Sequence, residues 1–174
     1  MTNYNLYSDA NGRGDICIVL FKDDIRQTNI ISKVKCEAAY DGEYKALLFA
    51  LENLPAIITN ELTNKDRVIF YVDSEYVAKQ INGTYKVKSK VVEPLYQKAM
   101  YRLSQLSSKV RTEVIWIPRK DNFSGQILEG KKSDEAGHPL RIVHVPEGVK
   151  MGHTRTVKIP SILHSQELEY NLDW

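Results

Sequence analysis

Three acidic residues, Asp9, Glu43 and Asp73, stand at positions from which carboxylates can bind a metal ion. Asp9 and Asp73 fall at the carboxyl ends of two segments rich in β-forming residues, 5–7 and 68–72. Sites in sheets flanked by helices gather at the carboxyl ends of strands. We therefore expect the side chains of Asp9 and Asp73 to lie close together.

Glu43 is predicted to lie in the first turn of a helix, on the face directed toward the protein core. Leu47 and Ala50 follow it at helical spacing on that face. An inward carboxylate must be paired, hydrogen-bonded or metal-bound, because a bare buried charge is too costly. The position of Glu43 therefore favours a role in the same site.

Three such carboxylates suit the binding of a hard cation. Mg²⁺ prefers oxygen ligands and keeps several waters, so a few carboxylates and a substrate phosphate complete its coordination. Two such ions roughly 3.5–4 Å apart activate a water and stabilise the leaving oxygen in phosphodiester cleavage. Taken singly, each acid has a simpler explanation: Asp9 in a turn, Asp73 as a helix cap, and Glu43 as a first-turn acid. The metal-site interpretation depends on all three together.

The elements that must position these acids follow from the hydrophobic pattern. Strands are predicted over 5–7, 16–21, 25–35, 68–72 and 110–117, and helices over 40–54, 74–81 and 94–106. Pro55 is expected to end the first helix, and Trp116 and Ile117 are expected in the core. This order predicts an α/β fold with a mixed five-stranded sheet flanked by helices.

Length and composition allow one main domain. The 174 residues divide into a predicted domain over 1–130 and a C-terminal extension over 131–174, where the pattern changes. We expect the extension to form a small β-hairpin or a flexible arm. The 24 basic and 22 acidic residues give a net charge of +2, which neither demands nor excludes a polyanionic partner.

The cellular compartment is suggested by the cysteines and by the hydropathy of the chain. Cys17 and Cys36 lack metal-ligand spacing, which indicates reduced thiols. The N-terminus is not a secretory leader, and no window approaches the ~20 apolar residues of a membrane span. We therefore expect a cytoplasmic protein that does not bind a membrane.

The sequence resembles the ribonuclease HI family in its bacterial and archaeal form. The resemblance rests on the stretches YSDANGRG, GEYKALLFAL, VDSEYVAKQINGTYKVKSK and WIPRKDN, whose order and spacing match over about 130 residues. The third stretch is the most specific, because a strand, an Asp-Ser pair, a helix and a Tyr-Lys segment agree together. The resemblance implies a ribonuclease H-like sheet.

The resemblance also implies an activity and a metal site. By position, Asp9, Glu43 and Asp73 would bind Mg²⁺, or Mn²⁺ in its place, and drive hydrolysis of the RNA strand of an RNA/DNA hybrid. The family normally adds a fourth carboxylate four residues after an Asn, and this sequence has Gln126 there. An amide supplies no negative charge and cannot act as a base. We expect either reduced activity or a substituted ligand, Gln126 itself or Glu129.

Five further residues are candidates for nucleic-acid contacts. They are Asn11, Ser74, Lys86, Lys88 and Lys90. The lysines would contact phosphates, and the two smaller side chains would donate hydrogen bonds near the cleaved strand. A solvated surface explains the lysines about equally well.

Two other functions remain open. The first is a non-catalytic module of the same fold, which binds nucleic acid or, through residues 131–174, a protein partner. Gln126 favours this alternative, and the presence of three other crowded acids opposes it. The second is a nuclease of the same fold that cuts DNA.

Overall fold

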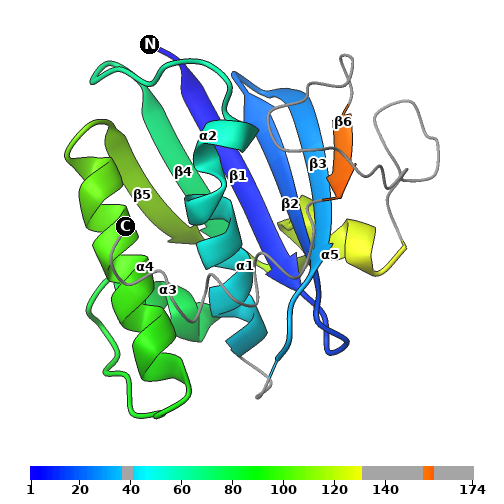
Figure 1. The fold of residues 1–174 in the computed structure, drawn as a ribbon, viewed down its shortest axis with the longest axis vertical. Helices are drawn as coiled ribbons and strands as arrows, with labels where there is room; N and C mark the ends of the chain where they lie inside the picture. Colours follow the sequence, from blue (N-terminus) through cyan, green and yellow to red (C-terminus); the bar gives the residue numbers. More distant parts are fainter. Residues whose placement is uncertain (37–40, 131–154, 159–174) are drawn as a thin grey trace.

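The β-rich segments of the sequence assemble into one mixed sheet, with the order β5-β4-β1-β2-β3-β6 (Figure 1). The computed structural model describes residues 1–36, 41–130 and 155–158. The strands are β1 (Asn3–Ala10), β2 (Asp15–Lys22), β3 (Ile25–Lys33), β4 (Arg67–Val72), β5 (Arg111–Trp116) and β6 (Arg155–Lys158). The helices are α1 (Asp41–Glu52), α2 (Leu54–Ile57), α3 (Glu75–Ile81), α4 (Val92–Ser107) and α5 (Phe123–Leu128), with a 3₁₀ turn at Arg119–Asp121.

The sheet combines antiparallel and parallel pairing. The pairs β1–β2 and β2–β3 are antiparallel, whereas β1–β4, β4–β5 and β3–β6 are parallel. The β1–β2 connection depends on Gly14, which has a φ of 81°. A Cβ at this glycine would stand 2.1 Å from the carbonyl oxygen of Val34, so a larger residue has no room there. The expected mixed sheet flanked by helices is confirmed.

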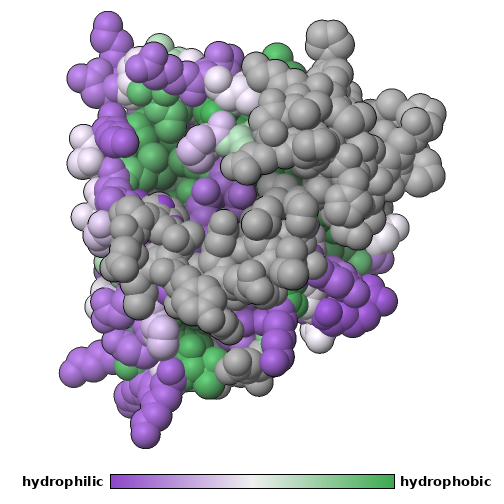
Figure 2. Space-filling model, viewed as in Figure 1, coloured by the Kyte–Doolittle hydropathy of each residue, from purple (hydrophilic) through white to green (hydrophobic). Residues whose placement is uncertain are grey.

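The two faces of the sheet are covered unequally. Helices α1 to α4 lie over one face, and α5 packs against β1 and β2 from the other (Figure 1). The main core lies under α1, where Leu47, Leu48 and Phe49 are fully buried against sheet residues such as Leu6 and Phe70. Figure 2 shows the helix-bearing face, where hydrophilic side chains occupy much of the margin around small hydrophobic patches. This arrangement leaves the far face of the sheet to α5.

Some sequence expectations need correction. Trp116 was expected in the core, but it ends the edge strand β5 and is 45% exposed. The first helix ends at Glu52, before Pro55, which instead lies in the first turn of the short helix α2. The five expected strands are all present in the sheet, and β6, from the C-terminal extension, adds a sixth beside β3.

The division of the chain at residue 130 stays a prediction. Apart from β6, which pairs with β3, the extension lies outside the described residues, and so does the choice between hairpin and arm. Among the described residues, no helix is both long enough and apolar enough to cross a membrane.

Candidate functional site

The structure brings Asp9, Glu43 and Asp73 together. Asp9 lies near the end of β1, Asp73 follows β4, and Glu43 lies in the first turn of α1. Strands β1 and β4 are parallel neighbours whose last paired residues, Ser8 and Val72, immediately precede the two aspartates. One carboxylate oxygen from each acid lies within 4.8 Å of the others. We call these three residues the acid cluster.

The acid cluster contains carboxylate oxygens without hydrogen-bond partners. Asp9 is completely buried, and neither of its carboxylate oxygens makes a hydrogen bond of good geometry; weaker contacts with Glu43 and with the Ala10 N–H lower its pKa only in part. Burial raises the pKa of Asp9, and the charge of Asp73 raises it further. Burial likewise raises the pKa of Glu43, followed by the charges of Asp9 and Asp73. Burial and neighbouring negative charge therefore disfavour the ionised forms of Asp9 and Glu43.

A divalent cation fits this set of ligands. Buried carboxylate oxygens without hydrogen-bond partners are the ligands that a hard cation prefers. A bound cation would also relieve the electrostatic repulsion that raises the pKa values of these acids. The three carboxylates come from a strand, a strand end and a helix, so the packing of α1 on the sheet fixes their separation. The site is therefore suited to bind a divalent cation.

Asn122 holds Asp73 in place. Its side-chain Nδ2 donates to Asp73 Oδ2 and to the backbone carbonyl of Ser8, both at 3.0 Å. Its Oδ1 accepts from the backbone N–H of Ser124 and so caps α5. Asn122 is fully buried and thereby connects β1, Asp73 and α5. In the sequence, Asn122 marks only the position from which residue 126 is counted, although an Asn before a helix is a common cap.

Helix α5 presents its backbone to the acid cluster at Gly125. A Cβ at this residue would stand 2.9 Å from Asp9 Oδ2 and 3.5 Å from Asp73 Oδ2. The absence of a side chain therefore lets the helix approach the carboxylates. Gly125, which was not singled out from the sequence, is the α5 residue that faces the site.

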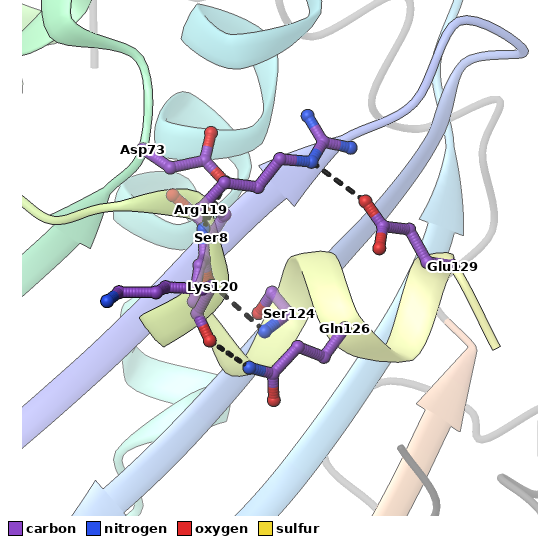
Figure 3. A network of polar contacts seen from close by, with 8 residues as sticks. Ser8, Asp73, Arg119, Lys120, Ser124, Gln126 and Glu129 are labelled. Carbon is purple, nitrogen blue, oxygen red and sulfur yellow. Dashed lines mark hydrogen bonds and ion pairs between the residues drawn. The ribbon is translucent and has the colours of Figure 1, made fainter. Parts of the chain in front are cut away.

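Gln126 and Glu129 make hydrogen bonds outside the acid cluster. The side-chain Nε2 of Gln126 donates to the backbone carbonyl of Lys120, toward which the side chain extends in Figure 3. The carboxylate of Glu129 accepts from Arg119 Nε at 2.8 Å (Figure 3). Among the residues that the structure describes, the group suited to a metal consists of Asp9, Glu43 and Asp73.

Arg119 supplies a positive charge beside the cluster. Its charge lowers the pKa values of Asp9, Glu43 and Asp73 and so opposes part of the effect of burial. Its own pKa is raised, first by the hydrogen bond to Glu129 and then by the nearby acids. The Arg119 side chain is 58% exposed, so it lies at the rim of the site. It is a functional candidate that the sequence analysis did not identify.

Asn11 and Ser74, two of the residues predicted to contact nucleic acid, both make hydrogen bonds within the protein. The side chain of Asn11 is used within its own turn, where it donates to Asp15 Oδ2 and accepts from two backbone N–H groups. Ser74 Oγ caps α3 by accepting from the N–H of Val77 at 3.4 Å. The structure therefore gives both residues local structural roles, and their contacts with nucleic acid stay predictions.

The predicted lysines lie beside an open hollow. Lys86 and Lys88 line it, together with the aromatic rings of Tyr76 and Tyr85, and its volume is about 610 Å³. The two rings have centroids 5.6 Å apart. Lys90 is exposed but is not among the lining residues. The hollow thus combines cationic groups with ring surfaces, and its role in binding stays a prediction.

Comparison with known proteins places the chain in a family. The sequence model of the reverse transcriptase-like family matches residues 6–128. The fold is similar to the N-terminal ribonuclease H domain of a Mycobacterium tuberculosis protein, with 20% identity and a TM-score of 0.58 over 75% of this chain and 94% of that one. It is also similar to ribonuclease H1 from Halobacterium salinarum, with 17% identity and a TM-score of 0.57 over 74% and 98% of the two chains.

A further similar structure is LC11 ribonuclease H1, a protein isolated from compost and solved in complex with an RNA/DNA hybrid. The identity is 20% and the TM-score 0.55, over 71% of this chain and 89% of that one. At sequence identities this low, the structural similarity supports only the fold. The family model matches most of the chain and therefore supports membership of the family. This chain belongs to the reverse transcriptase-like family and has the ribonuclease H fold.

Proposed function

We propose that this protein is a divalent-metal-dependent endonuclease that hydrolyses the RNA strand of RNA/DNA hybrids. The observation that carries the proposal is the acid cluster, whose buried Asp9 oxygens have no hydrogen-bond partner. Without a cation, the crowding of three carboxylates is offset only in part, by the Asn122 hydrogen bond to Asp73 and by the charge of Arg119 at the rim. The hybrid bound to LC11 ribonuclease H1 supports the choice of substrate.

The proposed roles follow from the position of each side chain. Asp9, Glu43 and Asp73 would hold Mg²⁺ or Mn²⁺ through their oxygens. The bound metal supplies an activated water and charge stabilisation for the leaving oxygen in phosphodiester cleavage. Asn122 keeps the Asp73 carboxylate oriented, and Arg119 offers a cation at the rim to the phosphate backbone.

Substrate binding is proposed to extend from the acid cluster to the hollow beside α3. Asp73 immediately precedes Ser74, the cap of α3, and this helix contributes Tyr76 to the hollow. Lys86 and Lys88 would contact the phosphate backbone there, while the rings of Tyr76 and Tyr85 offer surfaces for sugars or bases. The proposed compartment is the cytoplasm, in keeping with two free cysteines.

A second candidate function is supported by one observation. Gln126 supplies an amide in place of a fourth carboxylate, its Nε2 is bonded to the Lys120 carbonyl, and among the described residues no fourth Asp, Glu, His or Cys joins the acid cluster. A protein with a weakened metal site could bind hybrids without cleaving them. This binding module is the alternative that the experiment must separate from the nuclease.

The deciding experiment uses three labelled substrates of identical sequence: an RNA/DNA hybrid, duplex DNA and duplex RNA. Each is incubated with the protein in Mg²⁺, in Mn²⁺ and in chelator. We expect metal-dependent loss of the RNA strand of the hybrid alone. Binding of the hybrid without cleavage in either metal identifies the binding module, and cleavage of duplex DNA identifies a different nuclease.

A further inference from the structure

Trp116 makes a hydrogen bond to a member of the acid cluster. It is the last residue of β5, and its indole Nε1 donates to the backbone carbonyl of Asp73 at 3.2 Å. Residues 73 and 116 are far apart in the sequence, but β4 and β5 are parallel neighbours, so the bond joins the carboxyl ends of two adjacent strands. The side chain is 45% exposed, which is unusual for a residue whose role is only to fill a core.

The sheet stops supporting the backbone at Asp73. The last register pair between β4 and β5 joins Val72 to Trp116, and the last backbone bond runs from Ile117 N–H to the Val72 carbonyl. On the other side, the pairing of β4 with β1 also ends at Val72. The chain then turns into α3 at Ser74. Asp73 therefore lies between a strand and a helix, where side chains must hold it.

Two side chains hold Asp73, one at its main-chain carbonyl and the other at its side-chain carboxylate. Trp116 binds the main-chain carbonyl, and Asn122 binds the carboxylate. Neither partner is itself a member of the acid cluster. We propose that Trp116 is a positioning residue, which fixes the main chain of Asp73 so that its carboxylate meets the ion bound by the acid cluster. This inference rests on the proposed metal-dependent function.

The expected effect of removing this hydrogen bond is on metal binding. Groups that orient metal ligands typically change metal affinity or activity by roughly 10–100-fold when they are removed. Because Asn122 still holds the carboxylate, we expect the lower end of this range, about tenfold. The carbonyl of Asp73 is released at a partly exposed position, where water can replace the lost donor, so we expect little change in the stability of the metal-free protein.

The test uses Trp116→Phe, which keeps a large ring and removes the N–H donor. The matched control is Tyr101→Phe, which removes a polar group from a similarly exposed aromatic residue on α4, a helix that contributes nothing to the acid cluster. The first measurement, made without substrate, is the Mg²⁺ concentration that gives half of the maximal thermal stabilisation. The second is hybrid cleavage at saturating Mg²⁺, with kcat and KM determined separately.

For Trp116→Phe we expect the half-maximal Mg²⁺ concentration to rise about tenfold, kcat to fall, and KM for the hybrid to stay unchanged. The control should match the wild-type protein in all three. A Trp116→Phe protein that melts earlier but keeps the wild-type Mg²⁺ dependence has lost a structural contact only, and this result overturns the inference. If the wild-type protein binds Mg²⁺ without cleaving the hybrid, the proposed function fails, while the metal measurement still decides the role of Trp116.

Discussion

Gly125 of α5 lies so close to Asp9 that a Cβ on the glycine would stand 2.9 Å from a carboxylate oxygen of the aspartate. The helix backbone therefore forms one wall of the acid cluster. The aspartate is completely buried and cannot move away into solvent. The proximity of these two residues links the packing of α5 to the geometry of the proposed metal site.

A bulky side chain at residue 125 is expected to damage both packing and metal binding. Gly125→Val would force Asp9 or α5 to move, at a cost of about 1–3 kcal/mol in the free energy of unfolding. Urea unfolding and Mg²⁺ titration measure the two effects. Gly12→Val is the matched control, because nothing lies within 4 Å of a Cβ at Gly12. Equal effects of the two substitutions would contradict the close approach of α5.

Loss of the Asn122 side chain is expected to be costly. Asn122→Ala leaves the carbonyl of Ser8 and the N–H of Ser124 without their side-chain partner in a buried site, and it also frees the Asp73 carboxylate. We expect a destabilisation of about 2–3 kcal/mol, with a fall in Mg²⁺ affinity. Chemical denaturation and calorimetric titration of Mg²⁺ test this. A variant with wild-type metal affinity would show that Asn122 does not position Asp73.

Gln126 is expected to contribute to local structure and not to metal binding. Gln126→Ala removes the bond to the Lys120 carbonyl, which should cost about 1 kcal/mol of stability. The half-maximal Mg²⁺ concentration for cleavage should stay within about twofold of the wild-type value, because the Gln126 amide carries no charge and its Nε2 is bonded to the Lys120 carbonyl. A large increase in that concentration would show that Gln126 is a ligand after all.

The stability of the protein in chelator is expected to fall as the pH rises. The pKa values of Asp9, Glu43 and Asp73 are all raised in the folded protein, principally by burial. The folded state therefore holds protons that the unfolded chain releases above about pH 4, so the stability present at lower pH is lost as these groups ionise. Thermal melting at about pH 5 and about pH 8 measures the loss, and Mg²⁺ should stabilise the protein more at the higher pH. Equal melting temperatures in chelator would contradict the uncompensated repulsion.

The placement of the acid cluster could be predicted because each member has a local signal. Asp9 and Asp73 end β-rich segments, and Glu43 lies on the inward face of a helix whose apolar spacing is clear. The register of β1 with β4 then brings the two aspartates together. Such local patterns can be recognised in a single sequence because strands and helices each impose a characteristic spacing on their apolar residues.

The surroundings of the cluster could not be predicted in the same way. The rotation of α5 about its axis turns Gly125 toward Asp9 and Gln126 toward Lys120. This rotation follows from the packing of α5 on β1 and β2, and no spacing of residues in the sequence indicates it. The exposure of Trp116 depends on the position of β5 at the edge of the sheet. Strand order and helix rotation are tertiary properties, and spacing along the chain does not determine them.

The most direct test of the proposed function is cleavage of an RNA/DNA hybrid by the wild-type protein and by Asp73→Asn, measured side by side in Mg²⁺. The substitution keeps the shape of the side chain and removes one charge from the acid cluster, so the variant should fold, as circular dichroism and thermal melting will show. We predict metal-dependent cleavage of the RNA strand by the wild-type protein and, in the variant, a loss larger than the roughly 10–100-fold that is typical for groups that only orient a ligand. Wild-type rates in a correctly folded Asp73→Asn protein would contradict the assignment of the site.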